Sequence, residues 1–386
     1  MIEKPGAIII EGHVQGLSNV RSLGEQNVCV WVVDITSCIA RYSKYCNRFI
    51  KCPDFNSEKF IKFLIDLSIE NDLKSCLLLP SNDHIVKAIA QNHKTLKLHY
   101  QLITPSHEII ENIYDKSKLI SLATSSGVSC PETITINSIE QLPDEISFPI
   151  LIKGKEGLDF YKKTSKKAFE IESKDHLIET LKKIQKYISL DNILIQELIL
   201  YDENHHTVSV AVFSENGSIK THWMGEKLRE HPIRFGTATL ARSVEFKELL
   251  IQSSKLIKKL NFSGICEIEY LWNPVKKEYQ LIEINARTWL WVGLAKSCGV
   301  DFVKIAYDYV NENQINYPKD YLKGVYWYNP ITNFFFTILG LIKGQINFRS
   351  FLSILFKKKN NALFIWKDMK PGFIYLLSLL KIYRNR

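Results

Sequence analysis

The sequence predicts an α/β protein with three parts: a parallel, doubly wound sheet, a two-lobed α+β unit and a helical C-terminal tail. Its 386 residues exceed one ordinary domain, for which about 100–200 residues is typical. The first hundred residues alternate apolar runs with amphipathic helical patterns, as parallel sheets do. Later strands come in pairs around short turns. We place the predicted domains at 1–105, 106–192, 193–315 and 316–386.

The first domain contains three predicted strands and two predicted helices. Apolar runs at 7–10, 29–34 and 75–80 predict the strands, and periodic patterns at 58–72 and 84–96 predict the helices. This alternation of strand and helix predicts a Rossmann-like domain.

Ser81, Asn82 and Asp83 directly follow the third strand, at the carboxyl edge where such sheets bind ligands. A rival interpretation is a dinucleotide site, because glycines also follow the first strand. The actual spacing, Gly12-x-x-x-Gly16, lacks the G-x-G-x-x-G fingerprint, so the pattern does not favour NAD.

The region 106–192 predicts a small α+β lobe. It opens with a helix over 107–127, in which Gly127 is the expected C-terminal cap. Strands and a second helix follow at 131–136, 148–153, 168–173 and 174–188.

A strand at 193–200 begins the larger lobe, which then contains two hairpins and one helix. The first hairpin turns at Asn216-Gly217, since Asn-Gly supplies the positive φ that such turns need, and the second turns at Asn273-Pro274. The strands and the helix are predicted at 206–214, 218–225, 246–261, 264–272 and 278–285.

Acidic side chains share one face of the second hairpin. Alternation places Glu267 and Glu269 on one face of the first strand, and Glu283, Asn285 and Arg287 on one face of its partner. Two carboxylates and an amide oxygen are hard ligands that suit Mg²⁺ and leave positions open for phosphate oxygens. The alternative is a solvated edge hairpin. The apolar residues that alternate with the acids favour the metal site, because they give the hairpin a packed face.

Three further polar positions are candidates for nucleotide contacts. Lys153 ends an apolar strand and can present a point charge to a phosphate, although strand-end lysines are also common without such a role. Gln196 and Glu197 interrupt an apolar run, where a base and ribose, or neighbouring backbone, would supply their partners. Lys116 follows Asp115 at a helix start and is by itself typical of a solvated helix residue.

The net charge of +9 belongs to the C-terminal end of the chain. Residues 320–386 hold 11 Lys or Arg and 2 acids, while the remaining 319 residues hold 39 of each sign. A local interaction surface is therefore indicated rather than a nucleic-acid-binding body.

Apolar stretches at 324–342, 351–356 and 372–380 leave three alternatives for the tail: peripheral contact with an anionic membrane, a soluble helical cap or a true membrane span. The first fits the flanking lysines and arginines best.

The cysteines and the N-terminus favour a cytoplasmic protein with reduced thiols, peripheral to the inner face of the membrane if the tail makes contact. The eight cysteines form no C-x-x-C pair, and the first residues lack the pattern of a signal peptide. No catalytic triad or zinc cluster is indicated either.

The order of these motifs resembles the ATP-grasp enzymes, over roughly residues 1–315. The matching segments are Asp115-Lys116, FPILIK with Lys153, ILIQEL with Glu197, GICEIEYLW and LIEINAR. The resemblance is greatest to the predicted carboxylate-amine ligase branch that includes D-aspartate ligase. It implies a pre-ATP-grasp domain, a two-lobed ATP-grasp domain, and ATP and Mg²⁺ as cofactors.

The resemblance assigns phosphate contacts to Lys116 and Lys153, and an adenine or ribose contact to Glu197, with Gln196 beside it. The segment 225–243 resembles the part that closes over the active site, which makes Lys227 and Arg229 candidate anion contacts.

For the metal, the resemblance implies that Glu269, Glu283 and Asn285 hold Mg²⁺, two ions by expectation, with Mn²⁺ as a substitute. Arg287 would face the transferred phosphoryl group. The expected catalytic set is Arg287, Lys153 and Arg229.

One segment departs from the family pattern. The loop over the triphosphate is usually rich in glycine, because backbone N–H groups must approach phosphate closely. Here residues 153–167 contain only Gly154 and Gly157, among several lysines.

The predicted function is ATP-dependent amide formation from a carboxylate and an amine through an acyl phosphate. The substrates are expected to be small molecules, such as an amino acid or a cell-envelope precursor, and a homodimer is left open. The alternatives are a bicarbonate-activating enzyme related to carbamoyl-phosphate synthase or biotin carboxylase, and a degenerate ATP-binding scaffold.

Overall fold

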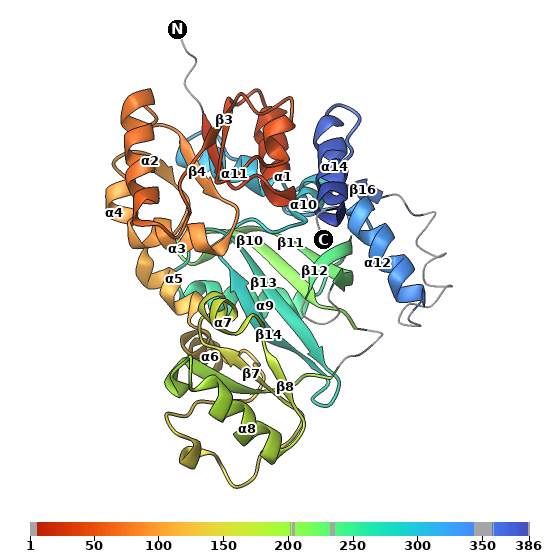
Figure 1. The fold of residues 1–386 in the computed structure, drawn as a ribbon. Helices are drawn as coiled ribbons and strands as arrows, with labels where there is room; N and C mark the ends of the chain where they lie inside the picture. The colour runs from red at the N-terminus through yellow and green to blue at the C-terminus, as the bar shows by residue number, and fades with distance from the viewer. Residues whose placement is uncertain are drawn as a thin grey trace.

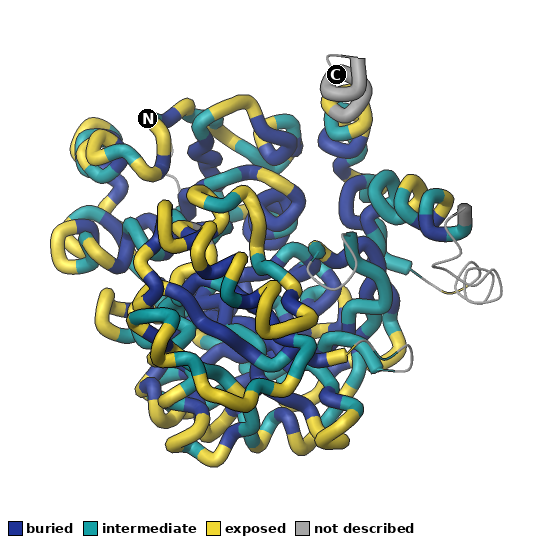
Figure 2. The backbone as a smooth tube through the Cα atoms, turned by 60° about the horizontal axis from the view of Figure 1, so that its bottom comes forward, coloured by how far each residue is buried: buried dark blue, intermediate teal, exposed yellow. Residues whose placement is uncertain are grey.

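The computed structural model describes residues 6–200, 202, 205–231, 236–342, 357 and 359–384. In Figure 1 the N-terminal domain lies at the top, a large sheet lies in the middle, a smaller lobe lies at the bottom and the C-terminal helices lie at one side. Buried residues concentrate along the central strands, and exposed residues lie at the periphery (Figure 2).

The first domain is the parallel, doubly wound sheet that the sequence predicts. Its five strands are ordered β3-β2-β1-β4-β5, and every pair is parallel. The strands are β1 (Ala7–Ile10), β2 (Val30–Asp34), β3 (Arg48–Lys51), β4 (Leu77–Pro80) and β5 (Gln101–Leu102). The helices are α1 (Val14–Gly24), α2 (Glu58–Asn71), α3 (Asp83–Gln91) and α4 (His93–Leu96).

The single helix predicted over 107–127 is two helices, α5 (His107–Tyr114) and α6 (Lys116–Ser125). Asp115 separates them. Its backbone is extended, and its carboxylate accepts hydrogen bonds from the backbone N–H groups of Ser117 at 2.8 Å and Lys118 at 3.3 Å. An N-cap within the periodic pattern therefore starts a second helix and brings Lys116 to its first turn.

The small lobe is a four-stranded sheet, ordered β6-β9-β7-β8, with its own apolar core. The segment predicted as the triphosphate loop contains helix α7 instead. The elements are β6 (Thr133–Ile134), β7 (Ile150–Gly154), α7 (Gly157–Thr164), β8 (Phe169–Ile171), α8 (Lys174–Ile184) and β9 (Ile193–Glu197).

The large lobe is a seven-stranded sheet, ordered β14-β13-β10-β11-β12-β15-β16. Its apolar core continues into the inner face of the first domain, where α1 packs against α10 and α11. The elements are β10 (Val208–Glu215), β11 (Ser218–His231), β12 (Thr237–Ser243), α9 (Lys247–Lys259), β13 (Gly264–Asn273), β14 (Glu278–Asn285), α10 (Val292–Ser297) and α11 (Phe302–Val310).

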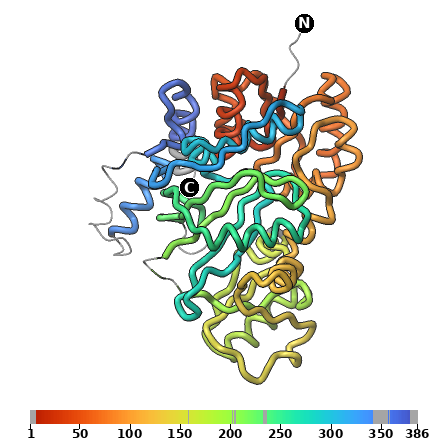
Figure 3. Tube along the Cα trace, turned by 180° about the vertical axis from the view of Figure 1, so that it is seen from behind, coloured from red at the N-terminus to blue at the C-terminus, as the bar shows by residue number. Residues whose placement is uncertain are grey.

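The C-terminal region, predicted as helical, also extends the large sheet. Strand β15 (Tyr326–Tyr328) pairs with β12, and β16 (Lys359–Asn361) pairs with β15. Helices α12 (Pro330–Ile342) and α14 (Lys370–Arg384) both project from one side of the body. The view in Figure 1 and the view from behind in Figure 3 both show this arrangement. The apolar stretch at 351–356 lies outside the described residues. In the described ranges, no helix combines the length and apolar character that crossing a membrane requires.

A buried ion pair fastens this region to the first domain. The Arg21 Nε donates to Asp368 Oδ2 at 2.8 Å, and the same guanidinium donates to the carbonyl oxygens of Ala362, Leu363 and Asp368. Asp368 also accepts hydrogen bonds from Ser43 Oγ at 2.7 Å and from the backbone N–H of Lys44 at 2.9 Å. With the Arg21 and Asp368 side chains 4% and 2% exposed, both charges depend on these partners.

We predict that Arg21→Met lowers the free energy of unfolding by about 3–5 kcal/mol, because it leaves the Asp368 carboxylate buried without its counter-charge. Urea unfolding followed by tryptophan fluorescence measures the loss. The control is Lys62→Met, which removes the exposed Lys62–Asp66 pair and is expected to cost less than about 1 kcal/mol. Equal losses in the two variants would contradict the importance given to the buried pair.

Candidate active site

The acidic hairpin forms, and it brings together the acidic faces that the sequence predicts for its two strands. In the antiparallel β13–β14 pair, Glu269 lies opposite Glu283 and Glu267 lies opposite Asn285. A register shift after Glu269 then changes the pairing along the rest of the hairpin. Because residues that lie opposite each other share a face, three carboxylates and one carboxamide gather on one side of the sheet.

Glu267 is a site residue that was absent from the predicted metal set, although alternation places it on the face of Glu269. It is 2% exposed, and it accepts hydrogen bonds from Ser209 Oγ at 2.7 Å and from Asn285 Nδ2 at 3.1 Å. Burial and the neighbouring Glu269 raise the pKa of Glu267 to about 8. The contact with Asn285 orients that carboxamide, which leaves its oxygen for other partners.

Two lysines balance the charge of this face. Lys227 Nζ of β11 lies 2.6 Å from Glu269 Oε2, and Lys116 Nζ of α6 lies 4.0 Å from Glu283 Oε2. Burial alone would raise the pKa of Glu283, but the charges of Lys116 and Lys227 hold it below its ordinary value. Burial likewise opposes the charge of Lys227, and Glu269 and Glu267 outweigh it, so the pKa of Lys227 is raised.

Lys153 lies next to the end of β7, one residue before Gly154, and its charge is poorly stabilised in the absence of a ligand. Removal of the ammonium group from water, and repulsion by Lys116, lower the pKa of Lys153 to about 7. Lys153 and Lys116 repel each other, and the nearby carboxylates do not fully offset this repulsion. Such a pair of lysines is suited to binding a polyanion.

Arg287 joins the hairpin to the first domain. Its Nε and Nη2 donate to the two carboxylate oxygens of Asp83, each at 2.8 Å, and Nη2 also lies 3.2 Å from Asn285 Oδ1. Asp83 accepts a third hydrogen bond from the Tyr114 hydroxyl at 2.9 Å. Burial would raise the pKa of Asp83, yet the Arg287 charge and these hydrogen bonds hold it below its ordinary value.

The other two residues at this sheet edge have structural partners. Asn82 caps α3 through the backbone N–H of Ile85 and also contacts Glu11, and the Ser81 hydroxyl lies 3.4 Å from Asn19 Nδ2. Asp83 is therefore the residue of this set that reaches the acidic hairpin.

The donor set fits Mg²⁺ bound together with a phosphate ligand. Among the described residues, no three His, Cys, Asp or Glu side chains are arranged to hold a metal ion by themselves. Mg²⁺ commonly binds proteins through one or two carboxylates and completes its octahedron with waters and substrate phosphates. Glu269, Glu283 and the Asn285 oxygen supply that partial set.

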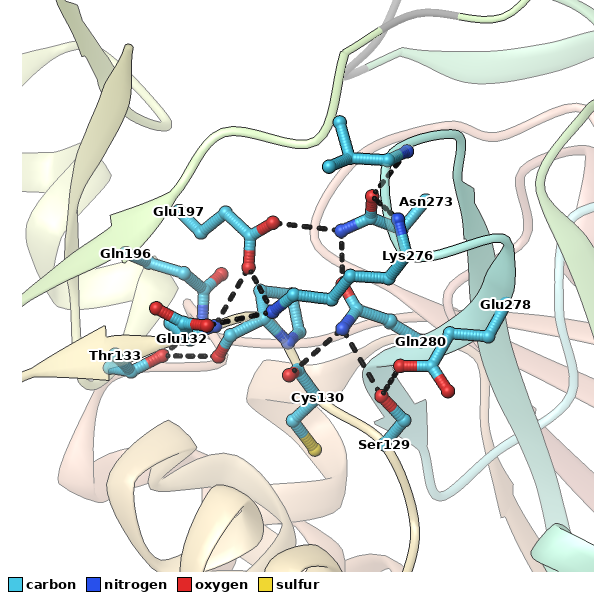
Figure 4. A network of polar contacts seen from close by, with 12 residues as sticks. Ser129, Cys130, Glu132, Thr133, Gln196, Glu197, Asn273, Lys276, Glu278 and Gln280 are labelled. Atoms are coloured by element: carbon cyan, nitrogen blue, oxygen red, sulfur yellow. Dashed lines mark hydrogen bonds and ion pairs between the residues drawn. The ribbon is translucent and has the colours of Figure 1, made fainter. Parts of the chain in front are cut away.

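The Glu197 side chain belongs to a network between the two lobes (Figure 4). It accepts hydrogen bonds from Asn273 Nδ2 at 2.8 Å, Lys276 Nζ at 2.9 Å and the backbone N–H of Glu132 at 3.1 Å. Gln196 is 5% exposed and donates to Thr133 Oγ1 at 2.7 Å. Their predicted nucleotide contacts would therefore involve backbone atoms or a rearrangement of these partners.

Arg229 lies apart from the acidic face. A bulge in β11 pairs Lys227 with Ala241 and Arg229 with Leu240. Because Ala241 and Leu240 are consecutive and point to opposite faces, the bulge turns Arg229 away from Lys227. The Arg229 guanidinium instead donates to Thr337 Oγ1 of α12 at 3.1 Å, so we leave it out of the proposed catalytic set.

Comparison with known families agrees with this fold. The family described as "Carbamoyl-phosphate synthase L chain, ATP binding domain" matches residues 113–314, more than half of the chain. The chain therefore belongs to this family and, as the motif order predicts, to the ATP-grasp enzymes. Members of the family bind ATP with Mg²⁺.

A D-aspartate ligase of Enterococcus faecium is 23% identical over 267 residues, which are 64% of this chain and 62% of that protein. The chain thus spans less than two thirds of the length of this relative.

Solved structures share the fold at low identity. The biotin carboxylase domain of Hydrogenobacter thermophilus 2-oxoglutarate carboxylase, in complex with MgADP, ADP and bicarbonate, has a TM-score of 0.66 at 14% identity. The match covers 84% of this chain and 74% of that one. An L-amino acid ligase of Bacillus licheniformis has a TM-score of 0.60 at 14% identity, covering 80% and 75%.

We predict that ATP binding at pH 8 takes up a proton at Lys153, because a lysine with a pKa near 7 is mostly neutral there and a triphosphate favours its charged form. Affinity should fall as the pH rises above 7, by at most about tenfold per pH unit. Calorimetry in buffers of different ionisation enthalpy measures the uptake.

In that titration Lys153→Met is expected to lose the proton uptake, and Lys182→Met, an exposed lysine on α8, is expected to keep it. Uptake that is unchanged in Lys153→Met would refute the assignment.

Proposed function

We propose that the protein is an ATP-dependent carboxylate-amine ligase that forms an amide through an acyl phosphate. The observation that carries the proposal is the charge balance at the acidic hairpin. Glu269, Glu283 and Asn285 offer metal ligands on one face, and Lys116 of α6 approaches the same face. Such a site suits a Mg²⁺-bound triphosphate better than a free metal ion.

Mg²⁺-ATP supplies the phosphoryl group that converts the substrate carboxylate into an acyl phosphate, which an amine can attack with release of phosphate. In the proposed site, Glu269, Glu283 and Asn285 hold Mg²⁺, two ions as in the sequence-based expectation, and Mn²⁺ can substitute. Glu267 positions Asn285 through its hydrogen bond to Nδ2. Lys116, Lys153 and Lys227 neutralise phosphate charge, which lowers the cost of gathering negative oxygens.

Arg287 is the proposed group that faces the transferred phosphoryl and the acyl phosphate. Its two hydrogen bonds to Asp83 fix the plane of the guanidinium. Nη1 donates to the Thr288 carbonyl oxygen at 3.0 Å, and its second N–H is the donor left for a phosphoryl oxygen. Asp83 is thus a proposed positioning residue, contributed by the first domain. The Gln196–Glu197 segment would contact adenine or ribose where β9 ends, beside the inter-lobe network.

The substrates are proposed to be a small carboxylic acid and an amine, such as an amino acid or a cell-envelope precursor. The likeness to a D-aspartate ligase and to an L-amino acid ligase supports this class. We further propose that the predicted units are the functional domains, and that 316–386 mediates a peripheral location at the inner face of the membrane. The predicted boundary at residue 193 is moved, because β9 (Ile193–Glu197) pairs with β6 and β7 in the small-lobe sheet, so the units become 1–105, 106–197 and 198–315. A homodimer stays a prediction.

A bicarbonate-activating reaction is the second candidate. It is supported by the matched family, which is named for carbamoyl-phosphate synthase, and by the likeness to a carboxylase domain whose structure contains bicarbonate. Helix α7, in the place of a glycine-rich loop, supports the third candidate, an ATP-binding scaffold without turnover.

A hydroxylamine trap distinguishes these candidates. The protein is incubated with Mg²⁺-ATP, hydroxylamine and a panel of amino and sugar acids, and hydroxamate and ADP are measured. We expect one acid to give hydroxamate, because hydroxylamine intercepts an acyl phosphate. ADP release that depends on bicarbonate alone would favour the second candidate. Nucleotide binding without ADP formation under any condition would contradict the ligase.

We also predict that Glu283→Gln lowers ADP formation at least about a hundredfold, since it removes a charged metal ligand where transition-state charge develops. The matched control is Glu248→Gln, at an exposed position of α9, which is expected to keep full activity. Retained ADP formation in Glu283→Gln would contradict the proposed metal site.

A further inference from the structure

Helix α12 leaves one apolar face uncovered. Phe334, Phe335 and Ile338 are 67%, 61% and 41% exposed, at the i, i+1, i+4 spacing of a single helix face. Another part of the helix packs on the large lobe, where Thr337 is 3% exposed and accepts the hydrogen bond from Arg229. One side of the helix therefore packs against the protein, and another side exposes apolar side chains to solvent.

Helix α14 and the turn before it repeat this arrangement. Phe373, Leu376 and Leu377 are 54%, 40% and 59% exposed, at the i, i+3, i+4 spacing. Trp366 is 91% exposed, among the largest exposed fractions of any apolar side chain that the structure describes. Large exposed apolar side chains that share one helix face mark an interaction surface rather than ordinary scatter.

The segment that contains these helices is strongly basic. Residues 321–386 contain eleven Lys or Arg and a single acid, Asp368. That acid is buried against Arg21, so it does not offset the exposed lysines such as Lys357, Lys367 and Lys370. Lys44 of the first domain adds a further exposed cation beside them, since its backbone N–H bonds Asp368.

We propose that α12, Trp366 and α14 form a docking face that inserts apolar side chains into the interface of an anionic lipid bilayer. Aromatic and leucine side chains enter the boundary between headgroups and acyl chains, and lysines beside them attract anionic headgroups. This proposal rests on the peripheral location proposed above for 316–386 and deepens it by naming the inserting side chains and the lipid charge, and it is independent of the ligase reaction.

Charge argues against the other occupants of this face. Protein interfaces are depleted of lysine at their centres. In a symmetric dimer each copy would present the same patch, and lysines would then oppose lysines. An anionic lipid surface is the partner whose charge complements both the sign and the spread of these residues.

The docking face is also held firmly to the catalytic body. Arg21 and Asp368 fix the segment before α14 to the first domain, and Arg229 contacts α12 from the large lobe. Lipid binding would therefore orient the body at the membrane rather than tether it loosely.

The test is cosedimentation of the full chain, without ATP, with vesicles of phosphatidylcholine alone or of equal parts phosphatidylcholine and phosphatidylglycerol. We expect binding to the anionic vesicles that falls as salt is added, and little binding to phosphatidylcholine. Failure to bind anionic vesicles, or equal binding to both kinds, would overturn the proposal whatever the ligase assay gives.

An apolar double variant, Trp366→Gln with Leu377→Gln, is expected to weaken vesicle binding at least about tenfold. Its matched control is Leu98→Gln with Ile251→Gln, which changes two similarly exposed apolar residues of the body, 68% and 62% exposed. Both variants should keep the thermal unfolding midpoint, because the replaced side chains are exposed. Equal effects of the two variants would overturn the proposal.

A basic double variant, Lys367→Gln with Lys370→Gln, is expected to weaken binding about 25-fold, about fivefold for each lysine. Its control replaces the exposed Lys247 and Lys259 of α9. Light scattering provides the competing outcome: a dimer that becomes a monomer in the apolar variant, without vesicle binding by the wild type, would assign the face to a second copy.

Discussion

The structure depends on the gathering of three carboxylates on one face of the β13–β14 hairpin. Glu267 and Glu269 are buried, and burial together with the neighbouring Glu269 charge raises the pKa of Glu267 to about 8. Such a cluster is tolerated only when counter-charges lie close. The counter-charges come from separate parts of the chain, Lys116 from α6 and Lys227 from β11. The positions of α6 and β11 relative to the hairpin are thus linked to the need to neutralise its carboxylates.

Two Arg–Asp pairs connect the first domain to the rest of the molecule. Arg287 reaches Asp83 from the end of the acidic hairpin, and Arg21 reaches Asp368 in the C-terminal region. Each pair joins residues more than 200 positions apart in the sequence. The first domain is therefore held rigidly against the proposed active site, and the proposed membrane-docking face is held against the same domain.

Much of the fold was predictable because local patterns specify it. The parallel sheet, the hairpin turn at Asn216-Gly217 and the pairing of Glu269 with Glu283 all follow from alternation, turn chemistry and burial. The break between α5 and α6 was harder to predict, because the apolar periodicity continues through Asp115. Only the capping hydrogen bonds of Asp115 show that a second helix begins there.

Contacts that depend on three-dimensional placement could not be predicted. Strand alternation gives Lys227 and Arg229 the same face, but one extra residue at a bulge separates them, and no sequence pattern here marks that bulge. The Arg287–Asp83 pair requires the packing of two domains. Glu267 was within reach of prediction, since its spacing from Glu269 is the strand period. The sequence did not reveal that the partners of Glu197 are Lys276 and Asn273 across the lobe junction.

In the proposed mechanism, the acidic hairpin becomes a metal site only together with a nucleotide. The most direct measurement is electron paramagnetic resonance of Mn²⁺ with the protein, with and without a non-hydrolysable ATP analogue. We predict weak Mn²⁺ binding to the protein alone, strong binding once the analogue is present, and loss of that gain in Glu269→Gln. Equal Mn²⁺ binding with and without the analogue, or an unchanged gain in Glu269→Gln, would contradict this mechanism.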